Sequence, residues 1–160
     1  MTRKTLCSPW RFDYVSTAAK QAGCIFCSAT ENAEAADSLV VHRAKRNFII
    51  LNRYPYNNGH LMIAPYEHIP DPADADPAVL EEMMRLFQQA VQALRKVYQP
   101  DGFNMGMNLG KCAGAGVEGH YHLHVVPRWN GDTNFLSTLA ETRVLPEEFS
   151  VTLAKLKPHF

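Results

Sequence analysis

The chain has 160 residues, 46% of them hydrophobic, so it can bury the core of one domain and needs no second domain. Its 16 basic residues balance 16 acidic residues, which excludes a long-range positive field that would draw it to nucleic acid or to an anionic membrane. Any phosphate that it binds must therefore be held by local contacts.

The N-terminal segment, residues 1–37, predicts irregular structure or short helix. It holds no apolar run of signal-peptide length, and no run in the chain could span a bilayer, so the expected compartment is the cytoplasm. Cys24 and Cys27 have the spacing Cys-x-x-Cys in this segment. Because a reducing compartment opposes stable disulfides, the pair indicates a zinc site, a redox pair or two buried thiols.

A meander and a long helix are expected next. Three short apolar or β-branched runs predict antiparallel strands: Val40–His42, Phe48–Asn52 and Leu61–Ala64. The sequence DPADADP at 71–77 suits a loop that ends where a helix starts. From Pro77 to Tyr98 apolar residues recur every three or four positions, which predicts a helix with one face on the sheet.

A further strand is predicted where apolar residues alternate with glycine and asparagine. The period of two places Phe103, Met105 and Met107 on one face and lets Asn108 end the strand facing a polar site. Strands, one long helix and more strands together predict a single α+β domain over residues 1–160. No element is assigned to the tail, residues 136–160.

Three histidines then alternate with other residues before an apolar pair: His120, His122 and His124. On a strand the three imidazoles share one face, whereas a helix would rotate His122 by roughly 200° from His120. The glycine-rich residues 110–116 just upstream can turn backbone N–H groups inward as an anion-binding nest. The alternatives are histidines on a solvated strand face, a plain tight connection, or three ligands of a catalytic zinc ion.

This pattern resembles the signature of the histidine-triad (HIT) family, His-x-His-x-His followed by two apolar residues. The similarity covers most of the chain, including NFIILNRYPYNNGHLMIAPYEH and GFNMGMNLG, while CIFC and AGAGVEGHYHLHVVPRW resemble the bacterial branch similar to diadenosine tetraphosphate phosphorylase. The resemblance implies a HIT-like fold, in which one long helix and shorter helices pack on an antiparallel five-stranded sheet. It also implies a homodimer with a continuous sheet and the helix 77–98 at its interface.

The resemblance assigns roles to individual residues. His122 would be the nucleophile that forms a covalent nucleotidyl-histidine, and His124 would assist at the phosphate. A neutral imidazole needs no deprotonating partner, and a covalent intermediate divides one difficult displacement into two easier ones. The other implied contacts are with phosphate, through Asn108, Ala115 and Gly116, and with the nucleoside, through Ile50 and Asn52.

The chain departs from the family pattern before the first histidine. Many members carry a glutamine and a hydroxyl residue at the positions of Gly116 and Val117. Their absence leaves the proton donor to the leaving group unassigned. It also argues against the phosphoramidase and triphosphate-hydrolase branches.

The resemblance also bears on the cysteine pair. In zinc-containing relatives two further ligands correspond to His68 and His120, which with Cys24 and Cys27 would complete a structural zinc site. Such a zinc would pin segment 1–37 to the sheet and fix the His120 ring. No redox cofactor is expected, and the sequence contains no magnesium motif.

The expected function is a cytoplasmic nucleotide-binding enzyme that cleaves dinucleoside polyphosphates as a phosphorylase or hydrolase. Adenine nucleotides are the expected substrates, and neither nucleic acid nor a membrane is an expected partner. Three alternatives remain open: a nucleoside phosphoramidate hydrolase, a zinc-dependent hydrolase that uses the three histidines as ligands, and a non-catalytic nucleotide-binding regulator.

Overall fold

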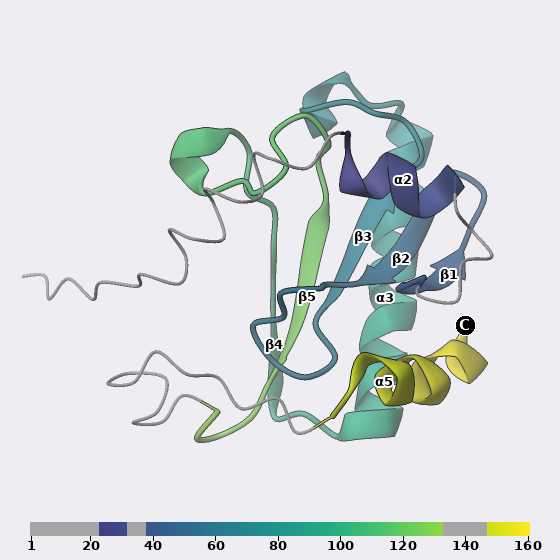
Figure 1. Cartoon of the computed structure of the whole chain (residues 1–160), viewed down its shortest axis with the longest axis vertical. Helices are drawn as coiled ribbons and strands as arrows, with labels where there is room; N and C mark the ends of the chain where they lie inside the picture. The colour runs from purple at the N-terminus through teal and green to yellow at the C-terminus, as the bar shows by residue number, and fades with distance from the viewer. Residues whose placement is uncertain (1–22, 32–37, 133–146) are drawn as a thin grey trace, which may run out of the picture.

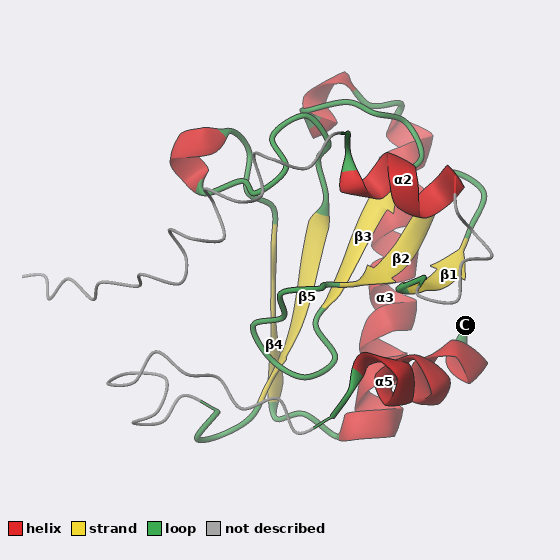
Figure 2. Ribbon diagram, viewed as in Figure 1, coloured by secondary structure: helices red, strands yellow, loops and turns green. Residues whose placement is uncertain are grey.

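The computed structural model describes residues 23–31, 38–132 and 147–160. Its centre is a five-stranded sheet of order β1-β2-β3-β5-β4, in which every neighbouring pair is antiparallel (Figures 1 and 2). The strands are β1 (Val40–Arg43), β2 (Asn47–Leu51), β3 (Leu61–Pro65), β4 (Gly102–Gly106) and β5 (Leu123–Arg128). The predicted α+β class and five-stranded antiparallel sheet are confirmed.

The strand order places His124, the last of the three histidines, inside the sheet. β5 lies between β3 and β4, and His124 pairs with Met62 on one side and with Gly106 on the other. The predicted meander accounts for β1, β2 and β3, which follow one another in the chain. The pairing of β3 with β5 joins segments far apart in sequence, and it brings the third strand of the meander beside the histidines.

α3 (Pro77–Tyr98) covers one face of the sheet with the predicted bounds. Asp76 caps its first turn, because the Asp76 side chain accepts a hydrogen bond from the N–H of Ala78. The helix ends at Gln99, which has a left-handed φ of 48°. Its buried residues recur at helical spacing and face the sheet: Val79, Met83, Leu86, Ala90, Ala93 and Leu94.

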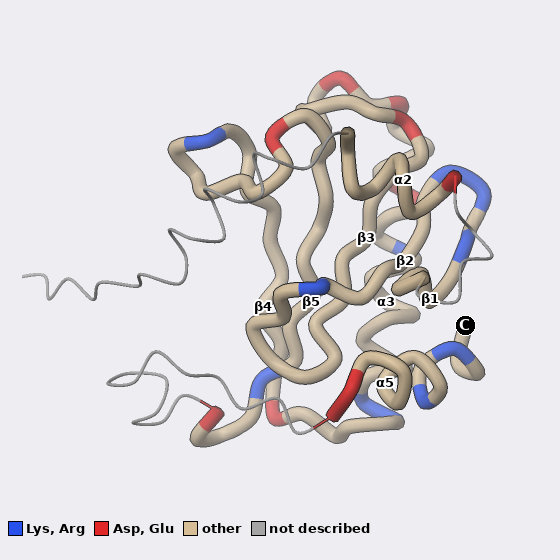
Figure 3. The backbone as a smooth tube through the Cα atoms, viewed as in Figure 1, with Lys and Arg blue, Asp and Glu red and all other residues tan. Residues whose placement is uncertain are grey.

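α2 (Ile25–Glu31) lies on the opposite face, in front of β2 and β3 in Figure 1. The alternation of side chains along β2 sends Ile49 to the core under α3 and Phe48 to the core under α2, where Phe26 is fully buried. Because both faces are covered, every residue of β2 and β3 is buried, and neither strand carries a charged side chain (Figure 3). The rest of segment 1–37 lies outside the described residues.

The C-terminal tail adds to the layer that contains α3. Two short helices close the chain: α5 (Phe149–Leu156) and the 3-10 helix η3 (Lys157–His159). Leu156 is fully buried in the core under α3. Before α5, the Glu147 carboxylate accepts hydrogen bonds from Tyr98 and, at 2.9 Å, from Thr152. Burial and this carboxylate raise the pKa of Tyr98 to about 12.

The predicted histidine strand begins later than expected. β5 starts at Leu123, so His120 and His122 precede its hydrogen-bonded part. Pro65 explains the difference, because proline has no N–H for a ladder and its carbonyl accepts a hydrogen bond from Nε2 of His120 at 2.9 Å.

Two other strand ends are also corrected. β2 ends at Leu51, so Asn52 begins the following connection, and β4 ends at Gly106, so Asn108 lies in the next loop. The last residue of β4, Gly106, pairs with His124, one residue inside the start of β5. Two 3-10 helices complete the described elements: η1 (Pro72–Asp74) and η2 (Lys111–Ala113). Among these described elements, no helix combines the length and the hydropathy needed to cross a membrane.

Hydrogen bonds to Glu82 connect α3 to the turn between β1 and β2. Its Oε2 accepts hydrogen bonds from the N–H of Arg46 at 2.7 Å, the N–H of Asn47 at 2.8 Å and the side-chain amide of Asn47 at 2.9 Å. We expect Glu82→Ala to lower the free energy of unfolding by about 2–3 kcal/mol, because buried donors lose a charged acceptor. Urea denaturation measures this, with Glu81→Ala as control, since Glu81 is exposed and pairs with Arg85 on the surface. Equal losses in the two variants would contradict the prediction.

Candidate active site and metal centre

The histidine rings gather on the sheet face that α2 covers. The ring centroids of His122 and His124 are 4.8 Å apart, and the Phe26 ring lies 4.7 Å from His122. His120 is fully buried, and His122 is 5% exposed. The residues that the sequence analysis singled out are thus brought together, in an environment where each imidazole nitrogen needs a partner.

His122 is held in one tautomer by the backbone. Its Nδ1 lies 3.0 Å from the carbonyl oxygen of His120. Because a carbonyl can only accept, Nδ1 carries the proton and Nε2 keeps a lone pair. Burial lowers the pKa of His122, although the hydrogen bond to His120 opposes this shift. The ring is therefore a neutral imidazole whose basic nitrogen is Nε2.

A fourth histidine, His60, belongs to the same cluster and was missed from the sequence. It is fully buried, and its Nδ1 accepts a hydrogen bond from the N–H of Tyr56 at 3.0 Å. Its Nε2, 3.0 Å from Nδ1 of His124, must then donate. His124 consequently carries its own proton on Nε2. Position was the available signal, since His60 directly precedes β3 and stands two residues before Met62, which pairs with His124.

His124 is kept neutral by its surroundings. Burial, together with the neighbouring His122, lowers the pKa of His124 to about 4. Its Nδ1 already accepts from His60, so the Nε2–H group is the donor that remains for another molecule. A neutral donor beside a nucleophilic imidazole is suited to bind an anionic oxygen without protonating the nucleophile.

The expected phosphate-binding residues lie in the loop between β4 and β5. Gly110 and Gly114 have positive φ values of 75° and 86°, on either side of η2. Asn108, Ala115 and Gly116 are half-buried in this loop. The N–H of Ala115 donates to the carbonyl of Gly110 at 3.3 Å, so this amide already has a long bond within the loop.

The expected nucleoside-binding residues flank the end of β2. Ile50 is 7% exposed and belongs to the core under α2, on the face of the histidines. Asn52 is 8% exposed, and its Oδ1 accepts from the N–H of Tyr54 at 2.9 Å. The Asn52 amide nitrogen is 3.4 Å from Nδ1 of His60. Asn52 thereby contacts the histidine cluster directly.

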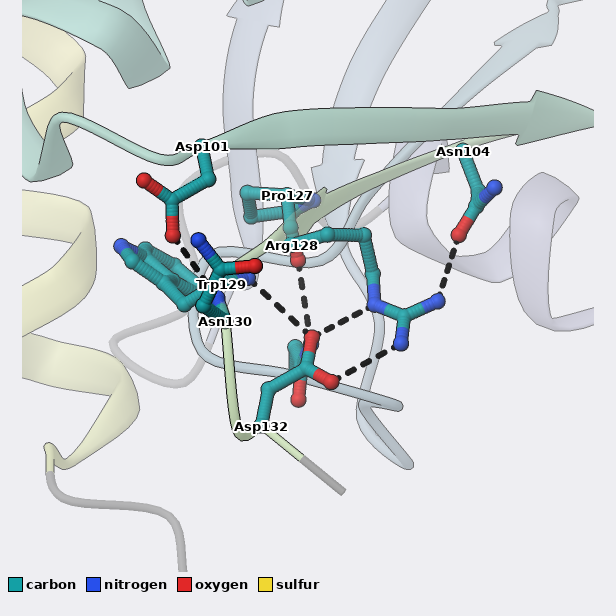
Figure 4. Close-up of polar contacts among 8 residues, drawn as sticks. Asp101, Asn104, Pro127, Arg128, Trp129, Asn130 and Asp132 are labelled. Atoms are coloured by element: carbon teal, nitrogen blue, oxygen red, sulfur yellow. Dashed lines mark hydrogen bonds and ion pairs between the residues drawn. The ribbon is translucent and has the colours of Figure 1, made fainter.

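A charged network beyond β5 fixes the connection that carries His60, and Figure 4 shows its central pair, Arg128 and Asp132. Beyond β5, the Asp132 carboxylate receives two hydrogen bonds from Arg128, at 2.5 and 2.8 Å, and one from the side chain of Asn57 at 2.7 Å. Arg128 lowers the pKa of Asp132 well below its usual range. The carbonyl of Asn57 accepts from the N–H of His60 at 3.2 Å, so the network reaches the histidine cluster.

The four residues expected to bind zinc converge beside this site. The potential ligand atoms of Cys24, Cys27, His68 and His120 lie within 4.8 Å of one another. Nδ1 of His120 is 3.4 Å from Sγ of Cys24 and 3.8 Å from Sγ of Cys27, and Nδ1 of His68 is 3.3 Å from Sγ of Cys27. A tetrahedral zinc with ordinary bond lengths has S···N edges of about 3.5 Å. The residues therefore fit a zinc ion.

Two further observations support the fit. The outer nitrogen of His120, Nε2, donates to the Pro65 carbonyl, the arrangement that orients metal-bound imidazoles. A Cβ atom on Gly119 would lie 3.1 Å from Nε2 of His68, so glycine makes room for that ring. Burial and the Cys24 thiol raise the pKa of Cys27, a cost that a bound cation would offset.

Comparisons with known proteins find similar sequences and structures. Residues 33–131 match the family model described as HIT domain. Over 111 residues the chain is 42% identical to a protein of Mycobacterium tuberculosis named AP-4-A phosphorylase, covering 69% of this chain and 57% of the relative. The chain therefore spans little more than half the length of that relative.

Two other comparisons concern activity and metal. A Schizosaccharomyces pombe protein named asymmetrical bis(5'-nucleosyl)-tetraphosphatase is 30% identical over 95 residues, which cover 59% of this chain and 52% of the relative. The crystal structure of a zinc-bound histidine triad family protein from Mycobacterium smegmatis aligns with a TM-score of 0.68 and 30% identity. That alignment covers 86% of this chain and 92% of the other.

The shifted pKa of His124 predicts a pH-dependent stability. An unfolded histidine titrates near pH 6.5 and folded His124 near 4, so between these values the unfolded chain binds more protons and the free energy of unfolding falls as the pH falls. Through His124 alone, the free energy of unfolding should fall by roughly 3 kcal/mol between pH 7 and pH 4. Urea denaturation at pH 7 and pH 4.5 should show a smaller loss in His124→Gln than in the native protein. Equal losses would exclude His124 as a source.

Proposed function

Because the chain belongs to the histidine-triad (HIT) family, we propose that it is a nucleotidyl-transferring enzyme that uses His122 to cleave dinucleoside polyphosphates. The observation that carries the proposal is the buried His122 ring, whose Nδ1 is tied to the His120 carbonyl and whose Nε2 keeps its lone pair. The name of the Mycobacterium tuberculosis relative, AP-4-A phosphorylase, supports a substrate with two linked nucleosides. We also propose a cytoplasmic location, because a reducing compartment keeps cysteine thiols available to bind a metal ion.

The reaction has two displacements at one phosphorus atom. In the first, Nε2 of His122 attacks the α-phosphorus, an N–P bond forms, and the P–O bond to the next phosphate breaks with its electron pair on the departing nucleotide. In the second, an oxygen of inorganic phosphate or water attacks the same phosphorus, and the N–P bond returns its pair to His122. From diadenosine tetraphosphate, phosphate yields ADP and ATP, whereas water yields AMP and ATP.

Four groups are suited to stabilise the charge that develops on the phosphoryl oxygens. The Nε2–H of His124 is a neutral donor whose tautomer His60 sets. The other three, Asn108 and the amides of Ala115 and Gly116, lie in the loop between β4 and β5 that precedes the histidines. The Ala115 N–H would exchange its long bond to Gly110 for a phosphate oxygen. We place the nucleoside against Ile50 and Asn52.

The alternative that the three histidines share a catalytic zinc ion is disfavoured by the two nitrogens of His120. Its Nε2 donates to Pro65, and its Nδ1 faces the thiols of Cys24 and Cys27. Neither nitrogen is left to join His122 and His124 on one ion. We propose instead that zinc binds the Cys24, Cys27, His68 and His120 cluster, where it would cross-link α2 to the sheet without contacting the substrate.

We also propose a homodimer with a continuous sheet. β4 is an edge strand, and Met105 on it is 48% exposed. Met84 on the outer side of α3 is 46% exposed. Pairing β4 and α3 with those of a second copy would cover both methionines.

The activity is tested by incubating the protein with diadenosine tetraphosphate, with and without inorganic phosphate. We expect ADP and ATP that form only with phosphate, and a loss of at least about a thousandfold in kcat for His122→Ala. His42→Ala serves as control, because His42 stacks on Phe160 away from the cluster. AMP and ATP without phosphate would identify a hydrolase. Absence of turnover that depends on His122 would contradict the proposal and direct the test to phosphoramidates.

The metal proposal is tested by the zinc content of the purified protein. We expect one zinc ion per chain, lost in Cys27→Ser and retained in Cys112→Ser, because Cys112 is exposed and stands outside the cluster. Removal of zinc by a chelator should lower the midpoint of thermal unfolding by roughly 5 °C or more, since binding energy contributes to folding. Equal zinc content in the two variants would rule out this site.

A further inference from the structure

Phe26 joins the metal cluster to the proposed nucleophile. It stands between Cys24 and Cys27 in the first turn of α2 and is fully buried. Its ring centroid lies 4.7 Å from that of His122, with the planes 40° apart, and 5.1 Å from that of His120. One aromatic ring therefore packs on both a metal ligand and the nucleophile.

Within residues 23–31, 38–132 and 147–160, one hydrogen bond and two ring contacts hold the His122 ring. Its Nδ1–H donates to the carbonyl of His120, which fixes one edge of the imidazole. The His124 ring meets it at 72°, with a centroid distance of 4.8 Å. Phe26 is the third support and the one that comes from outside the histidine run. Without Phe26, the hydrogen bond would still hold Nδ1, but the ring could pivot about it and move Nε2.

The position of α2 depends on contacts outside the helix. An isolated helix of seven residues is not stable in water, so contacts with the rest of the protein must hold it. One is the hydrogen bond from the Arg43 guanidinium to the carbonyl of Ala29 at 3.0 Å. A second contact is the buried Phe26 side chain. A third is the approach of Cys24 and Cys27 to His68 and His120 in the potential metal site. A metal ion on the two cysteines would fix the backbone on both sides of Phe26.

We propose that Phe26 is a positioning residue for His122 and that, through Phe26 and His120, metal binding at the cysteine cluster sets the orientation of the nucleophile. The inference rests on the proposed function for the role of His122. It gives the metal an effect on the rate of phosphoryl transfer without any contact between metal and substrate. A displacement of the reacting nitrogen by a fraction of an ångström is enough to slow the reaction, because attack requires near alignment with phosphorus.

The test compares Phe26→Leu with Phe48→Leu. Both residues are fully buried in the core under α2, and the substitutions remove the same atoms, but Phe48 packs against Phe26 and Tyr66 and makes no ring contact with a histidine among the described residues. We expect Phe26→Leu to keep its zinc, to lower kcat roughly tenfold and to change KM little. Phe48→Leu should keep kcat within about twofold while losing similar stability.

A second measurement does not depend on turnover, and part of it uses the native chain, so it does not require any variant to fold. In protein with 15N-labelled histidine, we expect the ring nitrogen resonances of His122 to shift when a chelator removes zinc from the native chain, and in zinc-loaded Phe26→Leu, but not in Phe48→Leu. Unchanged His122 resonances in the zinc-free native chain and in Phe26→Leu, or equal kinetic losses in the two variants, would overturn the proposal. If no His122-dependent turnover is found, the proposed function fails, and the nitrogen resonances alone decide the role of Phe26.

Discussion

The arrangement of the site depends on the three hydrogen-bonding groups of one buried residue, His120. Its Nε2 donates to Pro65 at the end of β3, its Nδ1 faces the two cysteine thiols, and its carbonyl accepts from His122. A flip of the ring would replace both nitrogens by carbon atoms, so it would break the contacts with Pro65 and with the cysteine thiols. The metal cluster and the proposed nucleophile therefore both depend on His120, the cluster through its ring and His122 through its backbone carbonyl.

The same logic of donors and acceptors extends across the cluster. Backbone groups determine which nitrogen carries the proton in two of the rings, because the His120 carbonyl accepts from Nδ1 of His122 and the Tyr56 N–H donates to Nδ1 of His60. Nε2 of His60 then donates to Nδ1 of His124, which leaves the His124 proton on Nε2. The assignments of His60 and His124 require neutral imidazoles, because each uses its Nδ1 as an acceptor and a protonated ring has no acceptor nitrogen. Burial favours the neutral form of both His122 and His124, so the low polarity of the site and its hydrogen-bond pattern support one another.

The sequence predicts those features that local periodicity determines. The spacing of apolar residues predicts both ends of α3, and the alternation of the histidines predicts that their rings lie on one side. It does not reveal that β3 pairs with β5, because such pairing depends on contacts between distant segments. His60 was missed for this reason, since its partner His124 lies 64 positions away. Phe26 was missed because buried aromatic residues are common in cores and only its neighbours show that it contacts histidines.

The division of the core into two clusters indicates what the metal site supports. The larger cluster joins α3 and α5 to one face of the sheet and includes none of the four potential ligands. The smaller one depends on Phe26 from a seven-residue helix, and its connection to the sheet includes a contact between Cys24 and His120, which are 96 positions apart. Bringing such distant residues together costs chain entropy that a short helix cannot offset by itself. A metal ion at the cysteines would therefore stabilise mainly the layer that covers the histidines, while the layer built on α3 would hold the sheet without it.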